Sequence, residues 1–165
     1  MDESLPGCNA IVDVLLGTWS KDALFHKWTL PDGHVAKVRV LEPTELRINI
    51  EELDDTRFTF RYNKNTPSTN GVSILANVVQ SIDGYIVREM IRKCHFEVAV
   101  IFDCFMCHPN NAEKMKQKYR EIMSEIASSD LLNDICSEIM GRDAGIEVSD
   151  EGLANMILNS EYALS

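Results

Sequence analysis

A chain of 165 residues, of which 45% are hydrophobic, is long enough for one sizeable core and short for two. It has no run of 18 apolar residues and its first residues lack the basic and apolar regions of a secretion signal, so we expect a cytoplasmic protein without a membrane-spanning helix. The net charge of −10 argues against a uniformly basic nucleic-acid-binding surface.

The acidic charge is concentrated near one end of the chain. Residues 121–165 carry ten acidic residues and one basic residue, whereas residues 1–120 carry sixteen acidic and fifteen basic residues. A function that needs a charge-balanced surface therefore remains open for residues 1–120. The five cysteines, an odd number in a chain without a secretion signal, predict reduced thiols instead of disulfides.

The first part of the chain predicts a helix followed by strands. A helix is expected over residues 9–19, within an N-terminal helical segment at 1–27. Antiparallel strands are predicted at 34–40, 45–51 and 56–62, within a segment at 28–62. A long amphipathic helix follows at 71–93, whose apolar residues recur at three- and four-residue steps. Its predicted core stripe contains Val72, Leu75, Val79, Ile82, Ile86 and Met90.

The segment 96–108 predicts a β-hairpin with one carboxylate, Asp103, at its tip. Apolar residues precede and follow Asp103, so both strands are expected to be buried. A buried carboxylate shifts its pKa, pairs with a cation or binds a metal, which makes Asp103 a candidate site residue. The alternative is an aspartate that caps its own turn by accepting a backbone N–H bond.

Three helices are expected after the hairpin. The first begins with a capping box of Asn110 and Glu113, and the second, at 130–141, is closed by Gly141. Ser149 is the expected N-cap of the third. The predicted fold is a single α+β domain over residues 1–165, in which residues 71–127 form a helix-hairpin-helix core and residues 130–165 form C-terminal helices and a tail.

The order helix, strand, aspartate-bearing turn, strand, helix resembles the palm of the single-subunit RNA polymerases of phages and mitochondria. In that family a helix with a phrase similar to Asn77-Val-Val-Gln-Ser-Ile-Asp-Gly84 precedes a His-Asp-Ser-Phe turn, which reads Phe102-Asp-Cys-Phe105 here. Trp28-Thr-Leu-Pro-Asp-Gly33 is similar to the family's Trp-x-x-Pro-Asp-Gly turn, and residues 157–165 are similar to its C-terminal tail. The resemblance covers roughly residues 28 to 165.

The resemblance implies a palm-like fold and a set of site residues. Asp103 matches the aspartate that binds the catalytic metals, and the C-terminal tail is expected beside the active site. Phe102 and Cys104 replace the family's histidine and serine, and Gln80 replaces a histidine that contacts the product–template duplex. The residues expected to contact nucleic acid or nucleotide are Asn77, Gln80, Ser81, Arg88 and Phe102, and the tail residues are Tyr162, Leu164 and Ser165.

The implied chemistry is nucleotidyl transfer assisted by two Mg²⁺ ions, which opposed carboxylates hold about 4 Å apart. One aspartate cannot hold such a pair, and the chain has no match to the family's first metal-binding aspartate or to its Arg/Lys/Tyr-bearing nucleotide helix. The resemblance therefore implies that this chain is the C-terminal palm subunit of a split phage DNA-directed RNA polymerase. It would be inactive without a second subunit that carries the other aspartate and the nucleotide helix. Its other partners are the DNA template, the RNA product and ribonucleoside triphosphates, in the host cell cytoplasm.

Other functions remain open at the level of sequence. A catalytically inactive relative that binds and regulates a polymerase would tolerate the changes at Phe102 and Cys104, and a structural α+β domain would use the hairpin only as a core feature. Cys104-Phe-Met-Cys-His108 also matches a haem-attachment pattern, and with Cys94 and His95 it offers enough ligands for zinc. Both metal centres are disfavoured, because haem attachment needs export and because Cys104 and Cys107 fall on opposite faces of a regular strand.

Overall fold

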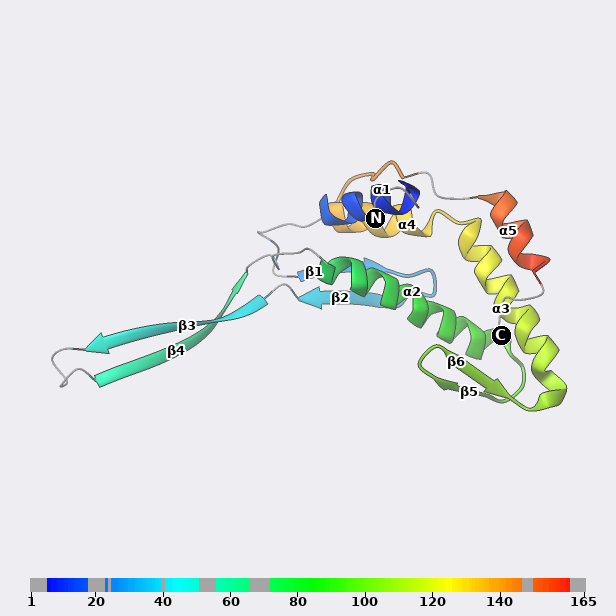
Figure 1. Ribbon diagram of the computed structural model, residues 1–165, viewed down its shortest axis with the longest axis horizontal. Coiled ribbons are helices and arrows are strands. Elements are labelled where there is room, and N and C mark those ends of the chain that lie inside the picture. Colours follow the sequence, from blue (N-terminus) through cyan, green and yellow to red (C-terminus); the bar gives the residue numbers. More distant parts are fainter. Residues whose placement is uncertain are drawn as a thin grey trace. The chain divides into compact units, whose positions relative to one another are not determined.

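The computed structural model describes residues 6–17, 23, 25–39, 41–50, 56–65, 72–146 and 150–160, and Figure 1 shows the order of its elements. The fold is mixed α+β, with helices and antiparallel two-stranded hairpins. The chain divides into two compact units, Met1–Lys27 with Lys37–Leu75 and Trp28–Ala36 with Ala76–Ser165, which are described separately. Among the helices in the described ranges, none has the length and apolar character needed to cross a bilayer.

The first unit contains a helix and a long β-ribbon. Helix α1 spans Pro6–Gly17, so the predicted helix is confirmed with an earlier start, and its Leu15 is buried. Strands β3 (Leu41–Ile50) and β4 (Thr56–Asn65) pair antiparallel along their whole length, from Leu41 opposite Asn65 to Ile50 opposite Thr56. The strands predicted at 45–51 and 56–62 are therefore confirmed.

Strands β1 (Phe25–Thr29) and β2 (Val35–Arg39) form a hairpin whose turn belongs to the second unit. The turn is closed by hydrogen bonds from Leu30 N–H to the His34 carbonyl, 2.9 Å, and from Gly33 N–H to the Leu30 carbonyl, 2.8 Å. Gly33 has φ 81°, a left-handed conformation that glycine adopts without strain. The strand predicted at 34–40 is confirmed, but β1 begins inside the segment that was predicted to be helical up to residue 27.

The second unit is built around helix α2, which spans Val72–Lys93 as predicted. Its core residues Ile86 and Met90 pack with Cys94 and with Ile122 of helix α3 (Ala112–Ala127). The predicted stripe was out of phase at the start of the helix, because Ile74 and Val78 are buried whereas Val79 is 49% exposed. Half-buried residues around this core come from α2, the following hairpin and α3: Ile82, Phe96, Val98, Phe105, Met115, Tyr119, Met123 and Ile126.

The hairpin after α2 consists of β5 (Val98–Ile101) and β6 (Cys104–Cys107), and a short 3₁₀ helix, η2 (Pro109–Asn111), leads into α3 (Ala112–Ala127). The predicted capping box is wrong: Asn111 is the N-cap of α3 and makes no side-chain cap bond. Instead, the His108 Nδ1 atom accepts the N–H of Asn110 within η2, at 3.3 Å. The 3₁₀ turn at Pro109–Asn111 shifts the start of α3 by one residue.

Two shorter helices complete the second unit. Helix α4 spans Leu131–Met140 and ends at Gly141 with φ 67°, as predicted. Its Glu138 accepts bonds from the backbone N–H and the hydroxyl of Thr29, at 2.6 and 3.0 Å. Helix α5 spans Glu151–Leu158 and packs against α3, and the Asp150 carboxylate accepts the N–H of Leu153 at 3.0 Å. Asp150 is therefore its N-cap, and the predicted cap, Ser149, lies outside the described residues.

Candidate functional site

The predicted β-hairpin is confirmed, but its strands are half-buried instead of buried. Ile101 pairs with Cys104, which leaves Phe102 and Asp103 as a two-residue turn. Exposure alternates along both strands, and Ile101 on the open face is 57% exposed. Asp103 is exposed at the tip, so it pays no burial penalty as a charged carboxylate. The expectation of a buried carboxylate was wrong because a run of apolar residues does not show whether one face or both faces of a hairpin are covered.

The residue before Asp103 has a strained backbone. Phe102 has φ 55°, a left-handed conformation that suits glycine or asparagine at this position of a two-residue turn and costs other residues about 1–2 kcal/mol. Its side chain is 91% exposed, so no burial of the ring offsets this cost. Strained residues of this kind concentrate at functional sites, where another requirement determines the choice of residue.

Asp103 lines a cleft of about 440 Å³ that is formed by α2, the hairpin tip and α3. Helix α2 contributes Gln80, Asp83, Gly84 and Val87, whose spacing of three, four and seven residues places them on one face of the helix. The cleft is therefore lined by two carboxylates from this chain, those of Asp83 and Asp103. The remaining lining residues are Ile86, Phe102, Phe105 and Tyr119.

The wall of the cleft on α3 is formed by Tyr119. Its ring packs at a tilt of 58° against Phe105, with 6.0 Å between the ring centroids. Burial raises the pKa of the Tyr119 hydroxyl, and the negative charges of Asp83 and Asp103 raise that pKa further. At neutral pH the hydroxyl is thus protonated and can donate a hydrogen bond to a carboxylate or a phosphate oxygen.

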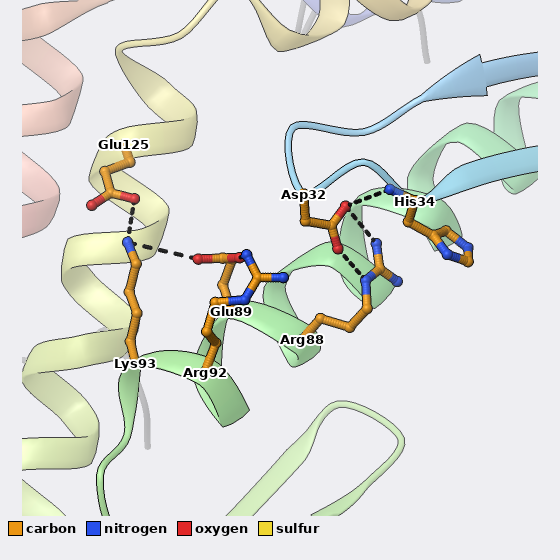
Figure 2. Close-up of polar contacts among 7 residues, drawn as sticks. All are labelled: Asp32, His34, Arg88, Glu89, Arg92, Lys93 and Glu125. Atoms are coloured by element: carbon orange, nitrogen blue, oxygen red, sulfur yellow. Dashed lines mark hydrogen bonds and ion pairs between the residues drawn. The ribbon is translucent and has the colours of Figure 1, made fainter.

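A different face of α2 contacts strand β1 and the β1–β2 turn. The Trp28 indole N–H donates to the Ser81 hydroxyl at 2.9 Å, and that hydroxyl donates to the Val78 carbonyl at 2.7 Å. Asp32 in the turn accepts hydrogen bonds from the Arg88 guanidinium, one of them from Nη2 at 3.3 Å, as Figure 2 shows. The Asp32 side chain is 2% exposed and that of Arg88 is 33% exposed, so this is a partly buried ion pair.

Two of the sequence landmarks that suggested a polymerase palm are thus joined directly in space. Trp28 and Asp32 belong to the first landmark, and Ser81 belongs to the second. Ser81 and Arg88, which were predicted to contact nucleic acid, have hydrogen-bond partners within the protein. Neither of them, nor the half-buried Asn77, is among the described residues that line the cleft.

The end of α2 is fixed to α3 by charged side chains. Lys93 forms an ion pair with Glu125 of α3, and it also lies 4.0 Å from the buried carboxylate of Glu89 (Figure 2). Arg92 donates to the same Glu89 at 2.7 Å. The Lys93–Glu125 pair joins the end of α2 to α3, and the contacts of Glu89 with Arg92 and Lys93 lie within α2.

The donors of the cleft match part of a Mg²⁺ site. Mg²⁺ is commonly held by one or two carboxylates, with phosphate oxygens and water completing the shell, and Asp83 and Asp103 offer two carboxylates. Within the described ranges, no group of three histidine, cysteine, aspartate or glutamate side chains is placed to hold a metal ion. The described cysteines are free thiols, as predicted, and the alternation of exposure places Cys104 and Cys107 on opposite faces of β6.

Sequence reasoning missed Asp83 and Tyr119. The signal for Asp83 was its place three residues after Gln80 on the same helical face, and for Tyr119 it was a polar hydroxyl among the apolar residues of the first helix after the hairpin. The predicted tail residues Tyr162, Leu164 and Ser165 lie outside the described residues. In comparisons with known proteins, no protein-family model and no curated protein matches this chain.

Proposed function

We propose that this chain is a palm-like subunit of a DNA-directed RNA polymerase, in which Asp103 is a catalytic metal-binding residue. The observation that carries the proposal is the placement of Asp103 at the exposed tip of a hairpin held by α2 and α3, beside a cleft that contains a second carboxylate. The direct contacts between the Trp28–Gly33 turn and α2 support it, because they join two of the landmarks on which the family resemblance rests.

The residues of the cleft have distinct roles in this proposal. The carboxylates of Asp103 and Asp83 would hold Mg²⁺, which when bound promotes attack by a 3′-hydroxyl and neutralises charge on the leaving pyrophosphate. The Tyr119 hydroxyl, protonated at neutral pH, would donate to an oxygen of the nucleotide or to one of the two carboxylates. The amide of Gln80 would donate to a minor-groove acceptor or a 2′-hydroxyl of the product–template duplex.

The exposed ring of Phe102 gives the hairpin tip an apolar surface where the family has a histidine. An exposed aromatic ring can stack on any of the nucleobases, whatever the nucleic-acid sequence, and such a contact contributes about 1–3 kcal/mol to binding. This role would also explain why a strained turn position holds phenylalanine instead of asparagine or glycine.

A second polypeptide is part of the proposal. The family's other metal-binding aspartate and its nucleotide-binding helix have no counterpart in this sequence, so a partner subunit would supply both, together with the basic surface for DNA template and RNA product. Ribonucleoside triphosphates are the proposed substrates. This division also accounts for the acidic charge of residues 121–165, because the nucleic acid would then lie mainly against the partner.

The test is templated RNA synthesis by the assembled enzyme with Asp103→Asn. The amide keeps the shape of the side chain and removes its charge, so we expect kcat to fall by about 100-fold or more, with an altered dependence on Mg²⁺. Asp134→Asn, on the exposed surface of α4, is the matched control and should retain full activity. Folding and subunit association should be unchanged in both variants.

Two results would contradict the proposal. Wild-type rates in Asp103→Asn would assign the hairpin a structural or regulatory role. Templated RNA synthesis by the isolated chain would show that no partner subunit is needed.

A further inference from the structure

The β3–β4 ribbon has two chemically different faces. Directly paired residues share a face of an antiparallel ladder, so the pairs Leu46–Phe60 and Ile48–Phe58 lie on one side, next to Tyr62. The rings of Phe60 and Tyr62 stack with 6.0 Å between their centroids. These five side chains, called the apolar face below, are between 40% and 61% exposed.

The opposite face is polar and carries an excess of positive charge. Arg61 pairs with Glu45 at 2.8 Å, and Arg57 donates to Asn49 at 3.4 Å. Arg47 also lies on this face, 3.6 Å from Glu45. Three arginines face one glutamate, so this polar face carries a charge of +2 in a protein whose net charge is −10.

An exposed apolar face on a two-stranded ribbon needs a covering surface. Isolated two-stranded hairpins are marginally stable in water, and a contiguous exposed apolar patch marks an interaction site. Strand-strand hydrogen bonds alone do not require large aromatic side chains on one face. The choice of Leu46, Ile48, Phe58, Phe60 and Tyr62 therefore points to burial against something else.

The area of the ribbon limits what can cover it. Each strand has ten residues, which corresponds to a length of about 34 Å, and two strands are about 10 Å wide, so one face covers roughly 340 Å². Two copies joined through their apolar faces would bury about 700 Å² in total, below the roughly 1,000 Å² of a specific interface. A groove that encloses both faces would bury about 700 Å² of the ribbon, near the roughly 800 Å² that one partner contributes to a stable complex.

We propose that the β3–β4 ribbon inserts into a groove of another polypeptide, with an apolar wall against Phe58 and Phe60 and carboxylates opposite Arg47 and Arg57. The apolar wall provides the affinity, and the carboxylates complement the positive charge of the polar face. This inference goes beyond the proposed function, because it requires a protein partner but neither Mg²⁺ nor catalysis.

The experiment measures association of the full chain with the polypeptide that co-purifies with it in equal amount from its native host. Phe58→Ser/Phe60→Ser should weaken association of the two purified proteins by about 30-fold or more, the loss typical of removing aromatic hot spots. The matched control, Leu153→Ser/Met156→Ser, removes two exposed apolar side chains of α5 and should bind within about twofold of wild type.

A second variant tests the charged side of the groove without touching the apolar face. Arg47→Gln/Arg57→Gln should weaken association several-fold at low ionic strength, and this difference should vanish near 1 M salt, where charges are screened within about 3 Å. Because this variant keeps all aromatic residues, it remains informative even if the serine variant fails to fold.

Four results would overturn the inference. The first two are unchanged affinity in both ribbon variants and the absence of a polypeptide that co-purifies in equal amount. The other two are self-association of the wild-type chain that Phe58→Ser/Phe60→Ser abolishes, and ribbon variants that lose duplex DNA binding while their partner binding stays intact. The Asp103→Asn variant separates this inference from the proposed function. It should bind the partner normally and lose RNA synthesis, whereas the ribbon variants should lose both through dissociation.

Discussion

The ion pair between Asp32 and Arg88 offers a quantitative test of how the β1–β2 turn is fixed to α2. We consider Asp32→Asn, Arg88→Gln and the double variant. Removing one member of a fully buried pair costs about 3–5 kcal/mol, because the other charge stays buried without its partner. Arg88 is 33% exposed, so water can solvate it partly, and we expect each single variant to lose about 2–3 kcal/mol of unfolding free energy.

The double variant should lose less than the sum of the two single losses, with a coupling free energy of about 1–2 kcal/mol. Urea unfolding of the full chain, followed by circular dichroism and by tryptophan fluorescence, to which the buried Trp28 contributes, measures all four proteins. Strictly additive losses would show that Asp32 and Arg88 do not interact. In that case Arg88 would be available for the nucleic-acid contact that the sequence suggested.

The same pair predicts a pH dependence. The hydrogen bond from Arg88 lowers the pKa of Asp32 below its ordinary value, although burial acts in the opposite direction, and the backbone N–H of His34 lowers it further. A carboxyl with a lowered pKa in the folded state stabilises the fold above its unfolded pKa of about 3.9 and loses this effect as pH falls through the folded value. The difference in stability between wild type and Asp32→Asn should therefore be constant from about pH 5 to 8 and shrink below about pH 4.

Two further variants test the cleft. Phe102→Asn should raise the unfolding free energy by about 0.5–1 kcal/mol in urea titrations, because asparagine tolerates the left-handed turn and the exposed ring contributes no burial. Templated RNA synthesis by the assembled enzyme should fall in the same variant. A variant that is no more stable than wild type would refute the strain argument. Asp83→Asn should leave the unfolding free energy within about 0.5 kcal/mol of wild type, because the side chain is exposed. It should raise the Mg²⁺ concentration needed for half-maximal RNA synthesis about tenfold. An unchanged Mg²⁺ dependence would show that Asp83 is not part of the site.

Much of the second unit could be predicted because its local signals agree with its packing. The hairpin around Asp103 follows from two short apolar segments separated by two residues, and α2 follows from a long helical periodicity. The phase of the α2 stripe was wrong at its start because Ile74, Val78 and Val79 are all apolar, so the pattern alone does not select the buried side. Contacts with the rest of the fold make that choice.

Strand β1 illustrates a different limit. Its buried residues are His26 and Trp28, and its exposed residues include Phe25, so the alternation of burial does not follow the alternation of polarity. Phe25 is 40% exposed, and the Lys37 ammonium lies 3.8 Å from the centre of its ring. The pairing of Arg88 with Asp32 was equally hidden, since nothing in the local sequence indicates which of two distant charged residues will meet.

One face of α2 lines the cleft and another contacts the β1–β2 turn. Both sets of contacts depend on the number of residues between them, so the length of this part of the helix is constrained. Residues advance by about 100° and 1.5 Å along a helix, so one residue inserted between Asp83 and Arg88 would turn Arg88 away from Asp32 while Gln80 and Asp83 stayed at the cleft. Inserting four residues would nearly restore the angle but would displace Arg88 by about 6 Å along the axis. Related chains should therefore vary at the exposed positions of this helix that make no such contact, and show insertions and deletions only outside residues 81–88.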